Sequence, residues 1–259
     1  MKGRSIPLSP ARRLVLEHCR LAQGVPKGAL RGDLALDAVA AARSAAGAAR
    51  PPWTAIMAKA MALAAREVPE LRRIYVKLPT PRLYEVPESV AAIVVERLLA
   101  GEPALFYGRV KAPDALPLAG IAARVREAKE APVEEVADFR AALLVSRLPQ
   151  PLRSAVVWTG RNLGRQVPNR FGTFGVTAVA AGGTVFSRVV THWTSCLSYG
   201  AIDRSGQVEA YLTFDHRVMD GAAAVRAFQA LAAALEGPVL AELRALDRAE
   251  VAVRIAARG

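Results

Sequence analysis

The sequence predicts a single α/β domain with a mixed sheet over residues 1–259. Helical patterns prevail early in the chain, and β-branched and aromatic residues interrupted by glycine prevail after Ser154. The sequence contains no internal repeat, and its one linker-like stretch, 45–52, is too short to separate two domains. Because 53% of the 259 residues are apolar, the chain can bury a sizeable core.

The first part of the chain predicts mainly helices. Ser9 and Pro10 are typical of an N-cap and a first helical residue, and they open a helix over about 10–23. Thr54 can cap a second helix, which ends near Val68. Strand-like runs and amphipathic helical patterns then follow in order: strands at 73–77 and 89–95, and helices at about 117–130 and 133–147.

The second part predicts mainly strands, at 154–159, 172–180, 184–190 and 193–202. A further strand carries an apolar row that ends in His216, while Asp215 points to the opposite face. A final helix is expected from Gly221 to Leu235, with Gly237 and Pro238 stopping it.

The formal charge of +12 suggests either an anionic partner or only solubility. Seven of these charges are arginines between Phe139 and Ile202, a stretch without any acid. The two cysteines form no disulfide framework, and no stretch reaches ~18 uninterrupted apolar residues. The charged, proline-containing start does not match a signal peptide. We therefore expect a cytoplasmic protein that does not bind membranes.

His216 is the first candidate for chemistry. It ends a predicted strand among apolar neighbours, and its unperturbed pKa of ~6.5 suits a general base. A core histidine held by packing is the alternative that periodicity alone leaves open. Asp220, just before the final helix, could equally be an ordinary N-cap.

The segment 214–221 resembles the catalytic signature of the acyltransferase subunits of 2-oxo-acid dehydrogenase complexes and of chloramphenicol acetyltransferase. Both enzyme groups carry a His, three residues, and then Asp-Gly, as His216 and Asp220-Gly221 do here. The opening segment 6–13, the segment 59–71 and the closing segment 228–238 resemble the dehydrogenase-complex subunits in the same order. The resemblance implies a chloramphenicol acetyltransferase-like two-layer fold and trimeric assembly.

The resemblance also implies a reaction mechanism. His216 takes the proton of a thiol, whose ordinary pKa is ~8.5, and the thiolate attacks a thioester. Phe174-Gly175-Val176-Thr177 is similar to the family segment whose fourth residue faces the reacting carbonyl, so Thr177 is expected to donate to the oxyanion. Without the resemblance, Thr177 is simply a β-branched strand residue. In the family, His and hydroxyl come from different subunits of the trimer.

Two further residues are implied to support the site. In the family, the Asp of the signature pairs with an Arg near the chain start, and Arg12 occupies the matching position. Arg12 falls in the first turn of its helix, where the helix dipole disfavours a cation. We expect Asp220 and Arg12 to aim His216 rather than to transfer protons.

The chain departs from the family in ways that bear on its partners. The catalytic match begins at residue 4, so this chain is expected to carry no lipoyl group. A separate lipoyl or acyl carrier protein, or free small molecules, would supply the acyl donor and acceptor. Residues 178–181 and 191–194 differ from the family near the expected acceptor pocket, which puts dihydrolipoamide as the acceptor in doubt. His192 and Trp193 are the candidate pocket residues.

Coenzyme A is the expected cosubstrate, and Arg161, Arg165 or Arg170 is expected to bind its phosphates. A solvated basic surface is the plain alternative. These arginines are spread over several elements without a nucleic-acid motif, so nucleic acid is not expected. His18, His192 and His216 are the only histidines, and no bound metal is predicted.

Two rival functions remain open. A trimeric scaffold homologue would retain the fold without turnover. A condensation-type biosynthetic enzyme also ends its signature in Asp-Gly three residues after a His, but normally has a second His where Asp215 stands. The sequence favours a stand-alone, coenzyme A-dependent acyltransferase that acts on a thiol, hydroxyl or amine. The resemblance implies that this enzyme assembles as a homotrimer or a multiple of trimers.

Overall fold

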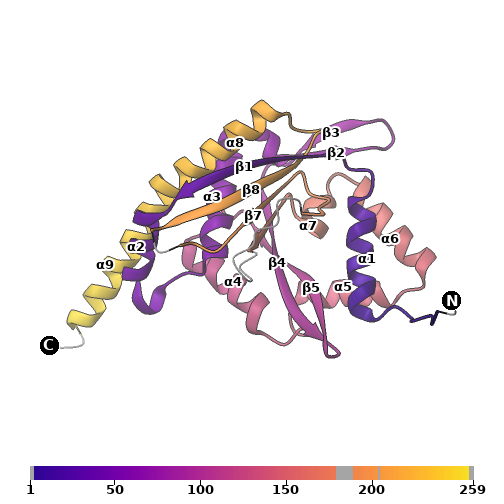
Figure 1. The fold of residues 1–259 in the computed structure, drawn as a ribbon, viewed down its shortest axis with the longest axis horizontal. Helices are drawn as coiled ribbons and strands as arrows, with labels where there is room; N and C mark the ends of the chain where they lie inside the picture. Colours follow the sequence, from indigo (N-terminus) through magenta and orange to yellow (C-terminus); the bar gives the residue numbers. More distant parts are fainter. Residues whose placement is uncertain (1–2, 179–188, 204, 257–259) are drawn as a thin grey trace.

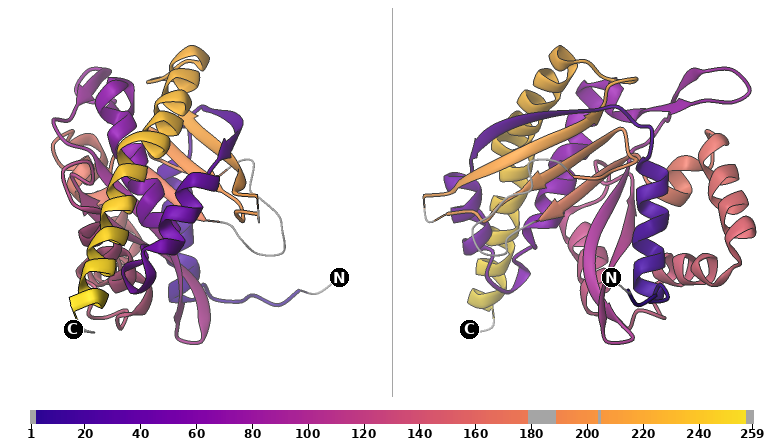
Figure 2. Two further views of the ribbon diagram at one scale, coloured as in Figure 1. Left: turned by 90° about the vertical axis from the view of Figure 1, so that its left-hand side faces the viewer. Right: turned by 45° about the vertical axis from the view of Figure 1, so that its right-hand side comes forward.

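The computed structural model describes residues 3–178, 189–203 and 205–256. A sheet forms one layer and the main helices cover one of its faces, as the turned view shows most clearly (Figure 2). The helices are α1 (Pro10–Ala22), α2 (Asp37–Ala45), η1 (Gly47–Ala49), α3 (Trp53–Glu67), η2 (Pro69–Arg72), α4 (Leu118–Glu130), α5 (Ala137–Arg147), α6 (Gln150–Asn162), α7 (Val167–Phe171), α8 (Gly221–Ala234), η3 (Leu235–Val239) and α9 (Leu240–Ala256). The strands are β1 (Lys27–Ala35), β2 (Arg73–Val76), β3 (Arg82–Glu85), β4 (Val90–Leu99), β5 (Glu102–Lys111), β6 (Phe174–Ala178), β7 (Ser195–Tyr199) and β8 (Gln207–Asp215).

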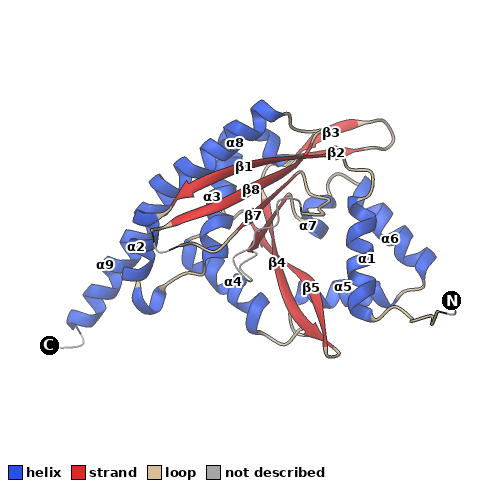
Figure 3. Ribbon diagram, in the orientation of Figure 1, coloured by secondary structure: helices blue, strands red, loops and turns tan. Residues whose placement is uncertain are grey.

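The sheet is mixed, as predicted. Over the described ranges, six strands run in the order β1-β8-β7-β6-β4-β5, and β2 and β3 pair separately as a hairpin. Strand β6 is parallel to both β4 and β7, while the other pairs are antiparallel. Figure 1 and Figure 3 show β1 and β8 crossing the top of the molecule and the β4–β5 hairpin descending below them.

Helix α3 forms the centre of the core. Most of its residues are buried, and it packs against α8, α4, β4 and β6. Its alanines present little side chain, which allows close approach of the neighbouring helix and strands. At the other end of the sheet, α1 and α5 pack against β5, so the helices on this side lie apart from the α3–α8 layer (Figure 1).

The predicted helices occur, but one begins later than expected and one has a different N-cap. The predicted helix over 10–23 is confirmed as α1, and Ser9 caps it by accepting from the Arg12 N–H at 3.2 Å. The helix expected over 133–147 begins only at Ala137. Thr54 does not cap α3; it lies inside the helix with its hydroxyl 3.2 Å from that of Tyr199.

The predicted strand at 154–159 is wrong, because these residues lie within α6. Their consecutive bulky side chains imitate a buried strand. The helix instead begins at Gln150, with Pro151 in its first turn, where a proline is tolerated. It is anchored to α1 by Arg153, whose Nε donates to Glu17 at 2.6 Å. Tertiary contact therefore overrides the local β preference. Most of the predicted strand at 184–190 lies outside the described residues.

The other predicted strands occur with shifted ends, as β2, β4, β6, β7 and β8. Strand β1 escapes prediction because glycines interrupt its pattern. A Cβ at Gly28 would lie 2.3 Å from the Phe214 ring, and one at Gly32 would lie 2.4 Å from the Phe228 ring. These glycines let aromatic rings pack on the strand backbone. Strands β3 and β5 were also not predicted from the sequence pattern.

The predicted end of the final helix at Gly237 and Pro238 is wrong. The helix passes through the π-helical turn η3 into α9. The shifted hydrogen bonds of a π turn accommodate a proline, which lacks a donor. Length and composition alone would let Gly221–Arg248 span a membrane. Its α8 part, however, packs on α3 and β1 with Ala223, Ala227 and Leu231 in the core.

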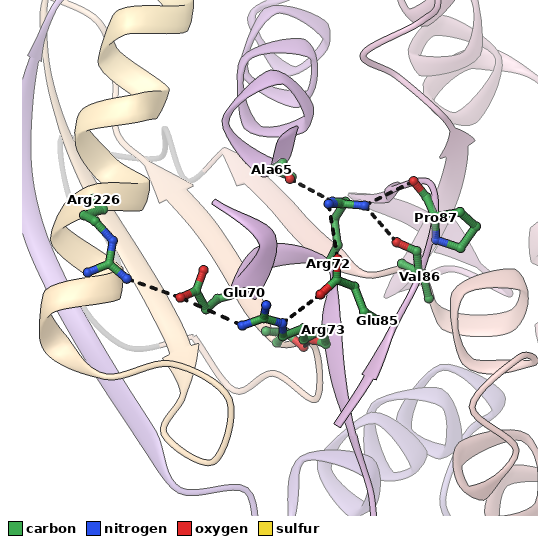
Figure 4. A network of polar contacts seen from close by, with 9 residues as sticks. Ala65, Glu70, Arg72, Arg73, Glu85, Val86, Pro87 and Arg226 are labelled. Carbon is green, nitrogen blue, oxygen red and sulfur yellow. Dashed lines mark hydrogen bonds and ion pairs between the residues drawn. The ribbon is translucent and has the colours of Figure 1, made fainter. Parts of the chain in front are cut away.

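A polar network fixes the β2–β3 hairpin to the helical layer (Figure 4). Glu70 accepts from Arg226 of α8 at 3.2 Å, and Arg73 donates to Glu85 of β3 at 2.9 Å. Arg72 donates to the carbonyl of Ala65, in α3, at 2.9 Å. The hairpin is thereby placed beside the end of β8.

Candidate active site

The turn that follows β8 is locked by its own side chains. Arg217 Nε donates to Asp215 Oδ1 at 2.9 Å, and Arg217 Nη2 donates to Oδ2 at 2.6 Å. Asp215 also accepts from the Arg217 backbone N–H at 3.0 Å. The guanidinium lies over the ring of Tyr75, 4.2 Å from its centroid. A fork-to-carboxylate pair of this kind fixes both direction and distance.

His216 lies between these two residues and is exposed. Its backbone N–H donates to the carbonyl of Pro26 at 2.9 Å, which ties it to the start of β1. Its ring lies 5.0 Å from that of Phe214. The backbone and one side of the imidazole are thus held, while the side chain remains accessible to another molecule.

Asp220 caps α8 by accepting from the Ala223 N–H at 2.7 Å. Arg12 is exposed in the first turn of α1. Across the described ranges, no ion pair joins Arg12 to Asp220 within one chain, so the structure does not bring together the pair that the resemblance implies. Asp220 fixes the segment after His216 through the helix N-terminus instead.

Thr177 lies on β6 with 9% of its surface exposed. It is paired with Ser198 of β7, which is paired with Tyr211 of β8. His216 is therefore five residues beyond the level of Thr177 and two strands away. At ~3.3 Å per residue and ~4.8 Å per strand, the two Cα atoms are roughly 19 Å apart. Within one chain, they cannot act on the same carbonyl.

Side-chain alternation separates the two sheet faces near Thr177. Val176, Leu197 and Leu212 belong to the main core under the helices. Thr177 has the opposite parity and lies on the face away from α3 and α8. That face also carries Trp193 and Cys196, which form a separate apolar cluster with Ala92.

A small pocket of about 20 Å³ lies beside the locked turn, which is room for about one water. Arg161, from the last turn of α6, lines it together with Asp215, Arg217, His192 and Trp193. Burial lowers the pKa of Arg161, and the charge of Arg217 adds to this shift. Arg161 is thus placed near the turn rather than out on a solvated surface.

The two other predicted coenzyme A residues lie further out. Arg170, in α7, is exposed and lines a second, larger pocket, whereas Arg165 is exposed in the connection between α6 and α7 and lines neither pocket. His192 and Trp193 line both pockets, so they form the wall between them.

Lys27 lies beside the locked turn, a position that was not predicted from the sequence. It is paired with Asp215 across β1 and β8, and its buried Nζ has no hydrogen-bond partner among the described residues. Burial lowers the pKa of Lys27 to about 8, against the attraction of Asp215. The one indication in the sequence is that Lys27 directly follows Pro26, at the start of β1.

The remaining reactive groups are assigned by their environment. Burial raises the pKa of the Cys196 thiol to about 12, so this cysteine is not a thiolate nucleophile. In the part of the chain that the structure describes, no group of three His, Cys, Asp or Glu side chains could hold a metal. His18 and His192 do meet, with ring centroids 5.2 Å apart.

Comparison with known proteins identifies the fold. No protein-family model matches the chain, and no curated protein matches its sequence. Solved structures match at 18% identity. They include the truncated catalytic core of the 2-oxoacid dehydrogenase multienzyme complex from Thermoplasma acidophilum (TM-score 0.66, covering 91% of this chain and 99% of that one). They also include the dihydrolipoamide acetyltransferase of Azotobacter vinelandii (0.65, 95% and 94%) and the cubic core of the pyruvate dehydrogenase multienzyme complex (0.62, 95% and 94%). The chain therefore has the fold of the catalytic cores of 2-oxo-acid dehydrogenase complexes.

Proposed function

We propose that the chain is a coenzyme A-dependent acyltransferase that moves an acyl group between acyl-CoA and a thiol, hydroxyl or amine. The observation that carries this proposal is the position of His216, which is exposed and fixed between Asp215 and Arg217 on the fold of an acyltransferase core. An accessible imidazole with a fixed backbone is the arrangement that a general base requires.

In the proposed reaction, His216 accepts the proton of the acceptor group, and the freed electron pair attacks the thioester carbonyl carbon. The Thr177 hydroxyl donates to the resulting oxyanion, a contribution of roughly 3–4 kcal/mol in other acyl-transfer sites. Collapse of the tetrahedral species breaks the C–S bond. The departing coenzyme A thiolate recovers the proton from His216, so the enzyme ends unchanged.

We place each reaction site between two chains. Thr177 and His216 are roughly 19 Å apart within one chain, by strand spacing and register, so a second copy must supply one of them. The N-terminal arm favours such assembly, because residues 3–9 extend away from the body (Figure 2) and expose Ile6 and Leu8. A homotrimer, or a multiple of trimers, is the assembly that the resemblance implies.

Arg165 and Arg170 are assigned to the phosphates of coenzyme A. Both are exposed, and no acid lies between Phe139 and Ile202 to compete with a phosphate. Arg161 lines the small pocket beside Asp215 and Arg217, and it interacts electrostatically with Asp215, so it is assigned to positioning the turn that carries His216. A separate lipoyl or acyl carrier protein in a cytoplasmic setting could present the acyl group. No part of this scheme requires a bound metal.

The first test is acyl transfer from acetyl-CoA to a thiol, measured as the free coenzyme A that the reaction releases. The expected result is turnover that disappears in His216→Ala. Folded, trimeric wild-type protein without turnover against a panel of acyl donors and acceptors would instead favour the scaffold homologue. A condensation-type enzyme would form an amide or ester from carrier-bound acyl groups but not from free acyl-CoA.

The second test is subunit complementation. His216→Ala and Thr177→Ala chains are expected to be inactive separately. Mixed assemblies of the two should regain activity, because some interfaces then join an intact His216 to an intact Thr177. If mixing restores no activity while mass spectrometry shows mixed trimers, the site does not lie between chains.

A further inference from the structure

The small pocket beside the locked turn has room for a single particle the size of a water molecule. Its volume is about 20 Å³. Its walls come from β2, α6, α7, the segments 172–173 and 192–194, and the turn after β8. Three charged side chains belong to this wall: Arg161, Asp215 and Arg217. The pocket therefore suits a water molecule or a monatomic ion rather than an extended organic ligand.

Most polar side chains at this wall already have hydrogen-bond partners. The Asp215 carboxylate accepts from Arg217 Nε at 2.9 Å, from Arg217 Nη2 at 2.6 Å and from the Arg217 backbone N–H at 3.0 Å. The Thr173 and Thr194 hydroxyls both donate to backbone carbonyls, and so does the Trp193 indole N–H. The principal acceptor at the wall, Asp215, is thus occupied.

The donors that remain free at the wall belong to two arginines. Across the described residues, the Arg161 guanidinium donates no hydrogen bond, and Arg217 uses Nε and Nη2 but not Nη1. None of these free nitrogens is fully shielded, so each borders open space. A guanidinium only donates, and it carries a positive charge. The free groups at the pocket therefore call for an acceptor, and a negatively charged acceptor makes the stronger hydrogen bonds.

Positive charge exceeds negative charge around the pocket. Arg161 is repelled by Arg217 and attracted by Asp215, and Lys27 interacts with the same three side chains. Three cations thus surround one carboxylate. The walls from α6, α7 and the 192–194 segment cannot restore the balance, because the stretch 139–202 contains no Asp or Glu. Partly buried charge without a counter-charge is unfavourable, and a bound anion would offset it.

We propose that the pocket binds chloride, which accepts hydrogen bonds from the Arg161 guanidinium and from Arg217 Nη1. A monatomic anion matches the volume of the pocket, its free donors and its surplus of positive charge. The ion lies between two like charges and links the last turn of α6 to the turn that carries His216. This site goes beyond the proposed acyl transfer, since it binds neither the acyl group nor coenzyme A.

The test is thermal unfolding of the purified oligomer in sodium gluconate that is replaced stepwise by sodium chloride at constant ionic strength. Gluconate is a sugar acid that is too large for the pocket. The unfolding midpoint is expected to rise with chloride and then to level off, because a ligand that binds the folded chain stabilises it by mass action. A midpoint that does not change with chloride would overturn the proposal.

Two variants separate a bound ion from a general effect of salt. Arg161→Gln removes the cationic donor and should abolish the rise of the midpoint with chloride. Arg147→Gln is the matched control and should keep the full rise, because Arg147 lies in the same acid-free stretch, is exposed and does not line the pocket. Equal rises in the two variants would contradict a site at Arg161.

A second measurement decides the matter if Arg161→Gln does not fold. Crystals of the unchanged protein grown in sodium bromide should show an anomalous scattering peak within hydrogen-bond distance of Arg161 and Arg217. A pocket without bromide in these crystals would overturn the proposal, even where bromide binds elsewhere on the surface. Because neither measurement includes acyl-CoA, a failure of acyl transfer at His216 leaves both results unaffected.

Discussion

Two guanidinium nitrogens of Arg217 donate hydrogen bonds to both carboxylate oxygens of Asp215, and His216 is the residue between them. This pair closes the turn after β8 at a point where the backbone is also tied to Thr194 and Pro26. The position of His216 therefore depends on a charge pair to which its own side chain does not belong.

Replacing Arg217 by Lys should reduce kcat by roughly 100-fold, because a small misplacement of a catalytic group has an effect of that size. Lysine keeps the charge but cannot grip both oxygens. Steady-state kinetics should show the loss in kcat with little change in KM. An unchanged kcat in folded Arg217→Lys would contradict this positioning role.

Gly28→Ala should destabilise the fold by about 1–3 kcal/mol, since the added Cβ would come 2.3 Å from the Phe214 ring. Phe214 also contacts the His216 ring, so activity should fall with stability. Urea unfolding measures the change. Gly237→Ala is the control, because nothing lies within 4 Å of a Cβ there. Addition of Phe214→Leu should relieve part of the strain; additive losses in the double variant would contradict the packing explanation.

Lys27→Met should raise the free energy of unfolding at pH 7. Above pH 8, the free energy of unfolding should depend less on pH in this variant than in the unchanged chain. Burial lowers the pKa of Lys27 to about 8 in the folded chain, against 10.5 ordinarily. Between these values the unfolded chain binds the extra proton, so the free energy of unfolding rises with pH. Below pH 8, the buried charge opposes folding. Thermal unfolding of both proteins from pH 7 to 10 should show the rise only with Lys27, and parallel curves would exclude this assignment.

The sequence singles out His216 and Thr177 through short segments that resemble a known family, and the predicted strands beside them are confirmed as β8 and β6 because strand alternation is a local pattern. The same reasoning failed at β1, where Gly28 and Gly32 make room for Phe214 and Phe228, rings from distant segments. It also treated Arg161 and His192 separately, although both line one pocket. Proximity of this kind arises from the packing of α6 and the 192–193 segment, and no local spacing records it.

The two ion pairs of Arg153 and Arg226 should differ sharply in their effect on stability. Arg153 is buried beside Glu17, whereas Arg226 is exposed beside Glu70. Arg153→Met removes the buried partner of Glu17 and leaves only the half-buried Arg20, which donates to the same carboxylate oxygen at 2.7 Å. The loss should be about 1–3 kcal/mol, while Arg226→Met should cost less than ~1 kcal/mol. Adding Glu17→Gln to Arg153→Met should recover part of the loss, because a buried carboxylate that has lost one of its two cationic partners is then replaced by a neutral amide. Chemical denaturation of the four proteins measures these differences, and equal losses in the two single variants would show that burial does not govern the Arg153 pair.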